Sequence, residues 1–128
     1  MNIQKFTQKS LEAIQNAQSI ALENQNSQIE QEHLMLSLLE QEDSLIKELL
    51  KKMGITNGFE ETLKNKINMM PKMSGGARPN DSIYVSRDID VTLNDAEKIA
   101  TKMKDEYVSV EHIMLSLFDN ANGQIKDL

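Results

Sequence analysis

The chain of 128 residues contains no cysteine, only two prolines and only five aromatic residues. The absence of cysteine excludes disulfides, thiol catalysis and cysteine-ligated zinc, and it fits a reducing cytoplasm. With so few aromatic residues the core has to be built from Leu, Ile, Met and Ala, a composition that favours packed helices over sheets. No apolar signal segment opens the chain, and no apolar run approaches the length of a membrane span.

Basic residues are also scarce. Lys and Arg total 14 against 20 Asp and Glu, so the net charge is −6 and the pI is about 4.9. A nucleic-acid or anionic-membrane surface needs a basic face to replace counterions, and the longest basic run here is Lys51-Lys52. The composition therefore predicts neither partner.

Helical periodicity runs through most of the chain. Leu11, Ile14, Ala17 and Ala21 recur at three- and four-residue spacing behind Thr7, a plausible N-cap. The segment 71–84 holds both prolines and two glycines with little periodicity, which is typical of a linker. Helices are predicted over about 8–25, from about 30, over about 43–53 and 57–70, after the caps Ser86 and Ser109, and from about 123.

An internal repeat is the sharpest feature. A shift of 79 residues aligns the two halves without a gap, with 12 identities in the 33 positions of 17–49. Neither copy can bury its apolar stripes alone, so the copies are expected to pack together. The prediction is one all-α domain, 1–128, with two pseudo-twofold repeats of about four helices each. Repeat one covers about 4–70, and repeat two covers about 85–128 and is expected to be truncated, as in a piece of a longer protein.

Catalytic motifs are missing from the sequence. There is no Gly-x-Ser-x-Gly, no phosphate loop and no His-Glu-x-x-His. The two histidines, His33 and His112, follow Glu32 and Glu111 at equivalent repeat positions. Adjacent residues lie about 100° apart on a helix, so neither pair chelates one ion easily. A non-catalytic domain without metal or other cofactor is expected, with a metal site bridging the two histidines as the lesser alternative.

The repeated glutamates have a structural and a functional interpretation. Glu111 sits in the first turn of a helix that Ser109 would cap, where negative charge favours the helix dipole, and His112 would pack or hydrogen-bond locally. Alternatively, Glu32 and Glu111 could converge near the pseudo-twofold axis and bind a cationic group such as arginine. That arrangement requires the two helix N-termini to meet at the repeat interface.

These motifs resemble a known family. Phe6-Thr7, Ala17-x2-Ile20-Ala21 and the two Glu-His segments look like the Clp N-terminal repeat over the whole chain. Met70-Pro71-Lys72-Met73 and the Gly-rich segment after it look more like ClpB-type disaggregases than ClpA or ClpC. The resemblance implies the substrate-handling domain of a cytoplasmic, hexameric AAA+ chaperone. It implies that unfolded or aggregated polypeptides and the DnaK system are the partners, that ATP and Mg²⁺ bind in downstream modules, and that the isolated domain is monomeric.

The resemblance also implies which residues engage clients. Positions matching Thr7, Asp105 and Glu111 are associated with chaperone activity, and an apolar groove would involve Leu93, Ile99, Val108 and Ile113. One departure is that both repeats keep the Glu-His pair, as in ClpC-type domains. The alternative function is therefore an adaptor or phosphoarginine-docking domain that uses Glu32 and Glu111.

Overall fold

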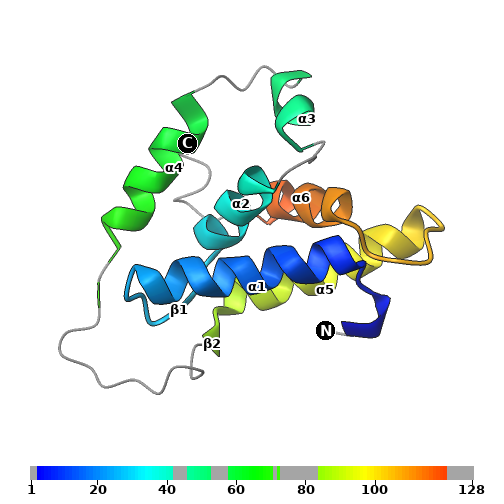
Figure 1. Cartoon of the computed structure of the whole chain (residues 1–128). Coiled ribbons are helices and arrows are strands. Elements are labelled where there is room, and N and C mark those ends of the chain that lie inside the picture. The colour runs from blue at the N-terminus through cyan, green and yellow to red at the C-terminus, as the bar shows by residue number, and fades with distance from the viewer. Residues whose placement is uncertain (1–2, 42–45, 53–57, 71, 73–83, 121–128) are drawn as a thin grey trace.

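The computed structural model describes residues 3–41, 46–52, 58–70, 72 and 84–120. Six α-helices, a short 3₁₀ helix and two two-residue strands make up this part of the chain (Figure 1). In chain order the elements are η1 (Ile3–Lys5), α1 (Gln8–Glu23), β1 (Gln28–Ile29), α2 (Gln31–Glu40), α3 (Ile46–Lys52), α4 (Gly58–Asn68), β2 (Tyr84–Val85), α5 (Arg87–Lys102) and α6 (Val110–Asp119).

The two halves are structural copies. Adding 79 to the bounds of α1 and α2 gives the bounds of α5 and α6. The turn after the first helix contains a residue with positive φ in both copies, Gln25 at 60° and Lys104 at 62°. In both copies a serine of the second helix donates to a carbonyl of the first at 2.6 Å. The predicted all-α double repeat is confirmed.

The copies also exchange backbone hydrogen bonds. β1 of the first repeat pairs in parallel with β2, which precedes the second, so that Ile29 lies opposite Val85. The reciprocal bridge joins Phe6, which precedes α1, to Val108 between α5 and α6. Each copy therefore completes the other, which gives a physical basis for the closed pair.

The core lies between the first and second helices of each copy and between α2 and α6. α1 presents Ala13, Ala17 and Ala21, all fully buried, so α2 can approach its backbone closely. Every residue of α2 from 31 to 39 is buried, as expected for a helix surrounded by others. In Figure 1, α2 and α6 lie in the middle of the molecule, with α3 and α4 on the side away from α1.

The predicted helix boundaries agree with the structure to within about three residues. Thr7 and Ser86 cap α1 and α5 through their side-chain oxygens, as the sequence predicts. The two short strands were not predicted, and β2 begins at residue 84, which the predicted linker included. The rest of that linker, apart from Lys72, and the helix expected from about 123 lie outside the described residues.

Candidate functional site

The two histidines occupy equivalent positions in the repeats, and each completes the capping box at the N-terminus of a helix. His33 is the third residue of α2, and its Nδ1 accepts the backbone N–H of the N-cap Glu30 at 2.8 Å. His112 takes the same place in α6 and accepts from the N–H of Ser109 at 2.9 Å. A Glu or Gln side chain usually fills this position of a capping box. The local hydrogen-bonding role expected for His112 is confirmed, and His33 shares it.

The second ring nitrogen is also engaged in both copies. His33 Nε2 lies 2.8 Å from Asn26 Oδ1, and His112 Nε2 lies 2.8 Å from Asp105 Oδ2. Since Nδ1 accepts a backbone N–H, the hydrogen-bond network assigns the remaining proton to Nε2. Neither imidazole therefore has a lone pair directed at a shared ion. Within the described residues no group of three His, Cys, Asp or Glu side chains could hold a metal.

Both imidazoles are buried, but their hydrogen-bond partners differ. His33 is fully buried, and desolvation lowers its pKa from 6.5 to about 4, so the ring is neutral at pH 7. Its partner is the buried amide of Asn26, whereas the partner of His112 is a carboxylate whose side chain is 48% exposed. The His33–Asn26 pair is thus buried and uncharged, whereas the His112–Asp105 pair includes a carboxylate at the surface.

Ser109, His112 and Asp105 have the composition of a catalytic triad. Ser109 Oγ lies 3.1 Å from His112 Nδ1. However, that nitrogen already accepts the Ser109 backbone N–H, and Ser109 Oγ accepts a backbone N–H of the first turn. These are the bonds of a helix cap, and they leave the imidazole without a free acceptor for the serine proton.

Of Thr7, Asp105 and Glu111, the structure places Thr7 at the junction between the repeats, and the other two lie three residues before and after Val108 in the chain. The Thr7 N–H donates to the Val108 carbonyl at 3.0 Å, although the two residues are 101 positions apart. Asp105 bonds His112 at the start of α6, and the half-buried Glu111 lies in the first turn of the same helix. Thr7 itself caps α1, with Oγ1 accepting the Ser10 N–H at 3.1 Å.

The predicted apolar groove is mostly interior. Leu93, Val108 and Ile113 are all buried, so in this conformation they offer no surface to a client, and only Ile99 is partly exposed. They are buried because α5 and α6 pack on each other and because Val108 pairs with Phe6. Of the four residues predicted for the groove, Ile99 has exposed surface and the other three lie in the core.

The second repeat also exposes apolar side chains that were not predicted as part of the site. Among the described residues, all but one of the large exposed hydrophobic side chains belong to the second repeat or its leading strand. Ile99 and Met103 are one turn apart on α5, a spacing that could have identified them. The set comprises Val85, Val91, Met103, Tyr107 and Leu115, with Met69 as the exception.

Glu32 and Glu111 do not converge. Gln31 at the start of α2 donates to the Asn120 carbonyl at the end of α6, at 2.9 Å. Glu111 lies nine residues before Asn120, which is about 14 Å along an α-helix. Glu32 is also buried, whereas Glu111 is half-buried. The expected two-carboxylate site on the pseudo-twofold axis is therefore not formed, because the N-terminus of α2 lies at the C-terminal end of α6.

Comparisons with known proteins agree with this architecture. The family described as Clp repeat N-terminal domain matches residues 5–128. The chain is 39% identical over its full length to chaperone protein ClpB of Clostridium tetani, and 40% identical over 90% of its length to ClpB 1 of Synechococcus elongatus. It spans only about 15% and 13% of these two relatives.

The fold has a counterpart among solved structures. The Hsp104 N-terminal domain from Candida albicans superposes with a TM-score of 0.83 and 29% identity, covering 96% of this chain and 78% of that one. Within the described residues no helix is both long and apolar enough to cross a membrane. The chain thus belongs to the Clp repeat N-terminal domain family, and its full-length relatives include ClpB chaperones.

Proposed function

We propose that this chain is the client-engaging N-terminal domain of an ATP-dependent ClpB-type disaggregase. The observation that carries the proposal is the concentration of exposed apolar side chains on the second repeat. Exposed apolar groups that lie together on one face are typical of an interaction surface. Ile99, Met103 and Leu115, called here the second-repeat surface, would contact apolar segments of unfolded or aggregated polypeptides.

The internal symmetry supports treating these three residues as one surface. Their equivalents in the first repeat, Ile20, Asn24 and Leu36, line a common groove. In the first repeat α4 packs on α2, and Leu36 is only 5% exposed, whereas Leu115 is 42% exposed. Among the described residues, Leu115 thus exposes apolar area whose equivalent in the first copy is covered by α4.

The surface is small, and this fits a client-handling role. A few exposed side chains bind each segment weakly, so clients can be released. Several such domains around a homohexameric ring would raise the avidity without new contacts. In this proposal ATP and Mg²⁺ act in other modules of a longer cytoplasmic protein, the DnaK system cooperates with it, and the domain itself does no chemistry. Thr7, Asp105 and Glu111 would flank the path of the client.

Titration with a permanently unfolded apolar protein, reduced and carboxymethylated α-lactalbumin, tests the proposal. Methyl NMR signals of Ile99, Met103 and Leu115 are expected to shift on binding. Met103→Ser is expected to weaken client binding about threefold to tenfold. The substitution removes apolar surface whose burial against the client would contribute about half of the transfer free energy of one fully buried apolar side chain.

Met69→Ser is the matched control, because Met69 is an even more exposed methionine, at 83%, on the first repeat. It is expected to leave the affinity unchanged. Equal losses in Met103→Ser and Met69→Ser would show that binding is not specific to the second-repeat surface. Binding that ignores both but disappears in Glu111→Ala would favour the phosphoarginine-docking alternative.

A further inference from the structure

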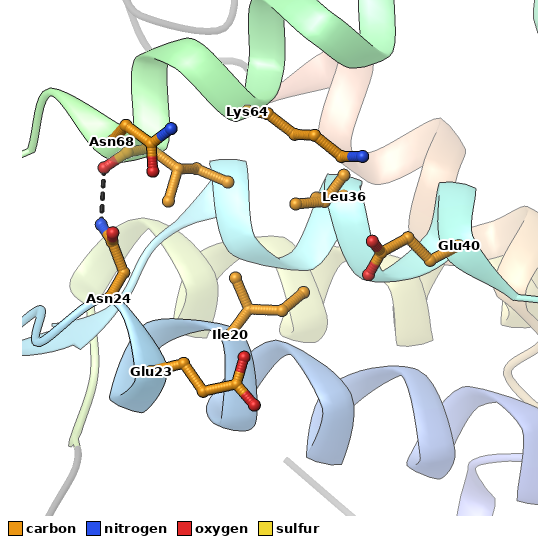
Figure 2. Close-up of a pocket in the computed structure, with 8 residues that line it drawn as sticks. Ile20, Glu23, Asn24, Leu36, Glu40, Lys64 and Asn68 are labelled. Carbon is orange, nitrogen blue, oxygen red and sulfur yellow. Dashed lines mark hydrogen bonds between the residues drawn. The ribbon is translucent and has the colours of Figure 1, made fainter.

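The first repeat contains an open groove between α1, α2 and α4. Its volume is about 300 Å³, and its apolar floor consists of Ile20, Leu36 and Ile67. In Figure 2, Ile20 points from α1 toward Leu36 on α2, and Lys64 reaches from α4 over Leu36. This volume is at the lower end for ligand sites, so it fits one or two side chains of a peptide.

One end of the groove is fixed by hydrogen bonds. Asn24 Nδ2 donates to the Ile67 carbonyl at 2.7 Å and to Asn26 Oδ1 at 3.0 Å (the first is the dashed line in Figure 2). The first bond joins the end of α1 to the end of α4, and the second holds the Asn24 side chain within the turn after α1. The groove is therefore maintained by the fold, because separating its walls would break this partly buried hydrogen bond.

The rim of the groove is negative. The carboxylates of Glu23 and Glu40 are both exposed, and Figure 2 shows Glu23 beside Ile20 and Glu40 pointing toward the groove from its other end. The one lysine on the rim, Lys64, lies 3.4 Å from Glu60, which offsets its charge. A ligand entering this groove meets two carboxylates and a cation that is already paired.

The C-termini of α1 and α2 add to the negative electrostatic potential of the groove. Glu23 is the last residue of α1 and Glu40 is the last residue of α2, and neither helix has a basic residue in its last turn. The carbonyl groups at a helix C-terminus carry partial negative charge and favour a cation. The two helix C-termini and the two carboxylates thus all favour a cation in the groove. The last turns of these helices contain no lysine or arginine to offset this negative potential.

The second repeat keeps the apolar floor and changes the charge. Ile99 and Leu115 are identical to their equivalents Ile20 and Leu36, but Lys102 stands at the position equivalent to Glu23. Asp119 keeps the charge of Glu40, so what is specific to the first repeat is the pair of carboxylates on the rim. We infer that this groove is a second binding site, and that it takes a peptide segment with one branched apolar side chain between two basic residues.

A synthetic peptide, acetyl-Gly-Arg-Ala-Leu-Ala-Arg-Gly-amide, tests the inference on the whole chain. Saturable shifts are expected for the Ile20, Leu36 and Ile67 methyl signals. Peptides with Glu in place of both Arg, or with Ser in place of Leu, are expected to bind at least about tenfold more weakly. Binding is expected to weaken between about 0.01 M and about 1 M salt, as the Debye length falls.

Glu23→Gln/Glu40→Gln is expected to weaken the arginine peptide about tenfold. Glu61→Gln/Glu106→Gln makes the same change in net charge at exposed sites outside the groove, and it is expected to leave binding unchanged. Equal effects of the two double variants, shifts at Ile99 and Leu115 instead, or no saturable shift would each overturn the inference. Because Met103→Ser is expected to have no effect here, failure of this site and failure of the second-repeat surface are told apart.

Discussion

At the scale of single residues, the two histidines show how one sequence position can serve the fold in two environments. Both are the third residue of a helix and accept the N–H of its cap. The neighbour of His33 is an uncharged amide inside the protein, and that of His112 is an exposed carboxylate. The sequence predicts a local role for these rings, but only the tertiary structure reveals that the His33 ring is fully buried.

Acid is expected to destabilise the fold through His33. Its pKa is lowered to about 4 in the folded chain, so the unfolded chain binds the proton first. The resulting stability is complete above the unfolded value near 6.5 and is lost as the pH falls toward 4, by up to about 3 kcal/mol. Urea unfolding of wild type and of His33→Gln, which can still cap the helix, measures this difference. Parallel pH profiles of the two proteins would contradict the assignment.

Thr7 is a second residue whose role can be separated by substitution. Its side chain caps α1, and Thr7→Ala is expected to cost about 1 kcal/mol of folding free energy, as is Ser86→Ala in the other copy. Thr7→Ser keeps the cap and is expected to retain both stability and client binding. If Thr7→Ser folds normally but loses client binding, the threonine methyl group contacts the client and capping is not its whole function.

At the scale of elements, equivalent residues diverge because their surroundings do. Leu36 and Leu115 are the same residue at the same repeat position, yet α4 packs on α2 beside the first and the second stays exposed. Leu36→Ala is expected to cost about 2–5 kcal/mol, whereas Leu115→Ala is expected to cost less than about 1 kcal/mol. Urea denaturation of the two variants compares them directly. Equal costs would mean that Leu115 is also covered.

The helices were predictable and the strands were not, for a physical reason. Side-chain periodicity over three or more turns identifies a helix, and Thr7, Ser86 and Ser109 mark their starts. β1 and β2 contain two residues each, too few to display a period of two, and their pairing joins segments more than fifty residues apart. No local sequence pattern predicts such a long-range contact.

At the scale of the whole molecule, the candidate site depends on how the copies interlock. The junction of Thr7 with Val108 brings together residues that are 101 positions apart, which spacing alone does not predict. Leu93, Val108 and Ile113, which were predicted to line an apolar groove, are buried in the core that the two copies share. Apolar character predicts burial and binding equally, and only packing decides between them.

Interlocking also predicts that the repeats unfold together. Phe6 precedes α1 but bridges Val108 of the second copy and is almost fully buried. Phe6→Ala is expected to cost about 3–5 kcal/mol and to reduce hydrogen-exchange protection in α6 as much as in α1. Val85 occupies the equivalent position and is 44% exposed, so Val85→Ala is the matched control and is expected to cost less than about 1 kcal/mol. If α6 kept its protection in Phe6→Ala while α1 lost it, the two copies would be independent folding units, and the exchanged strands would contribute little to their association.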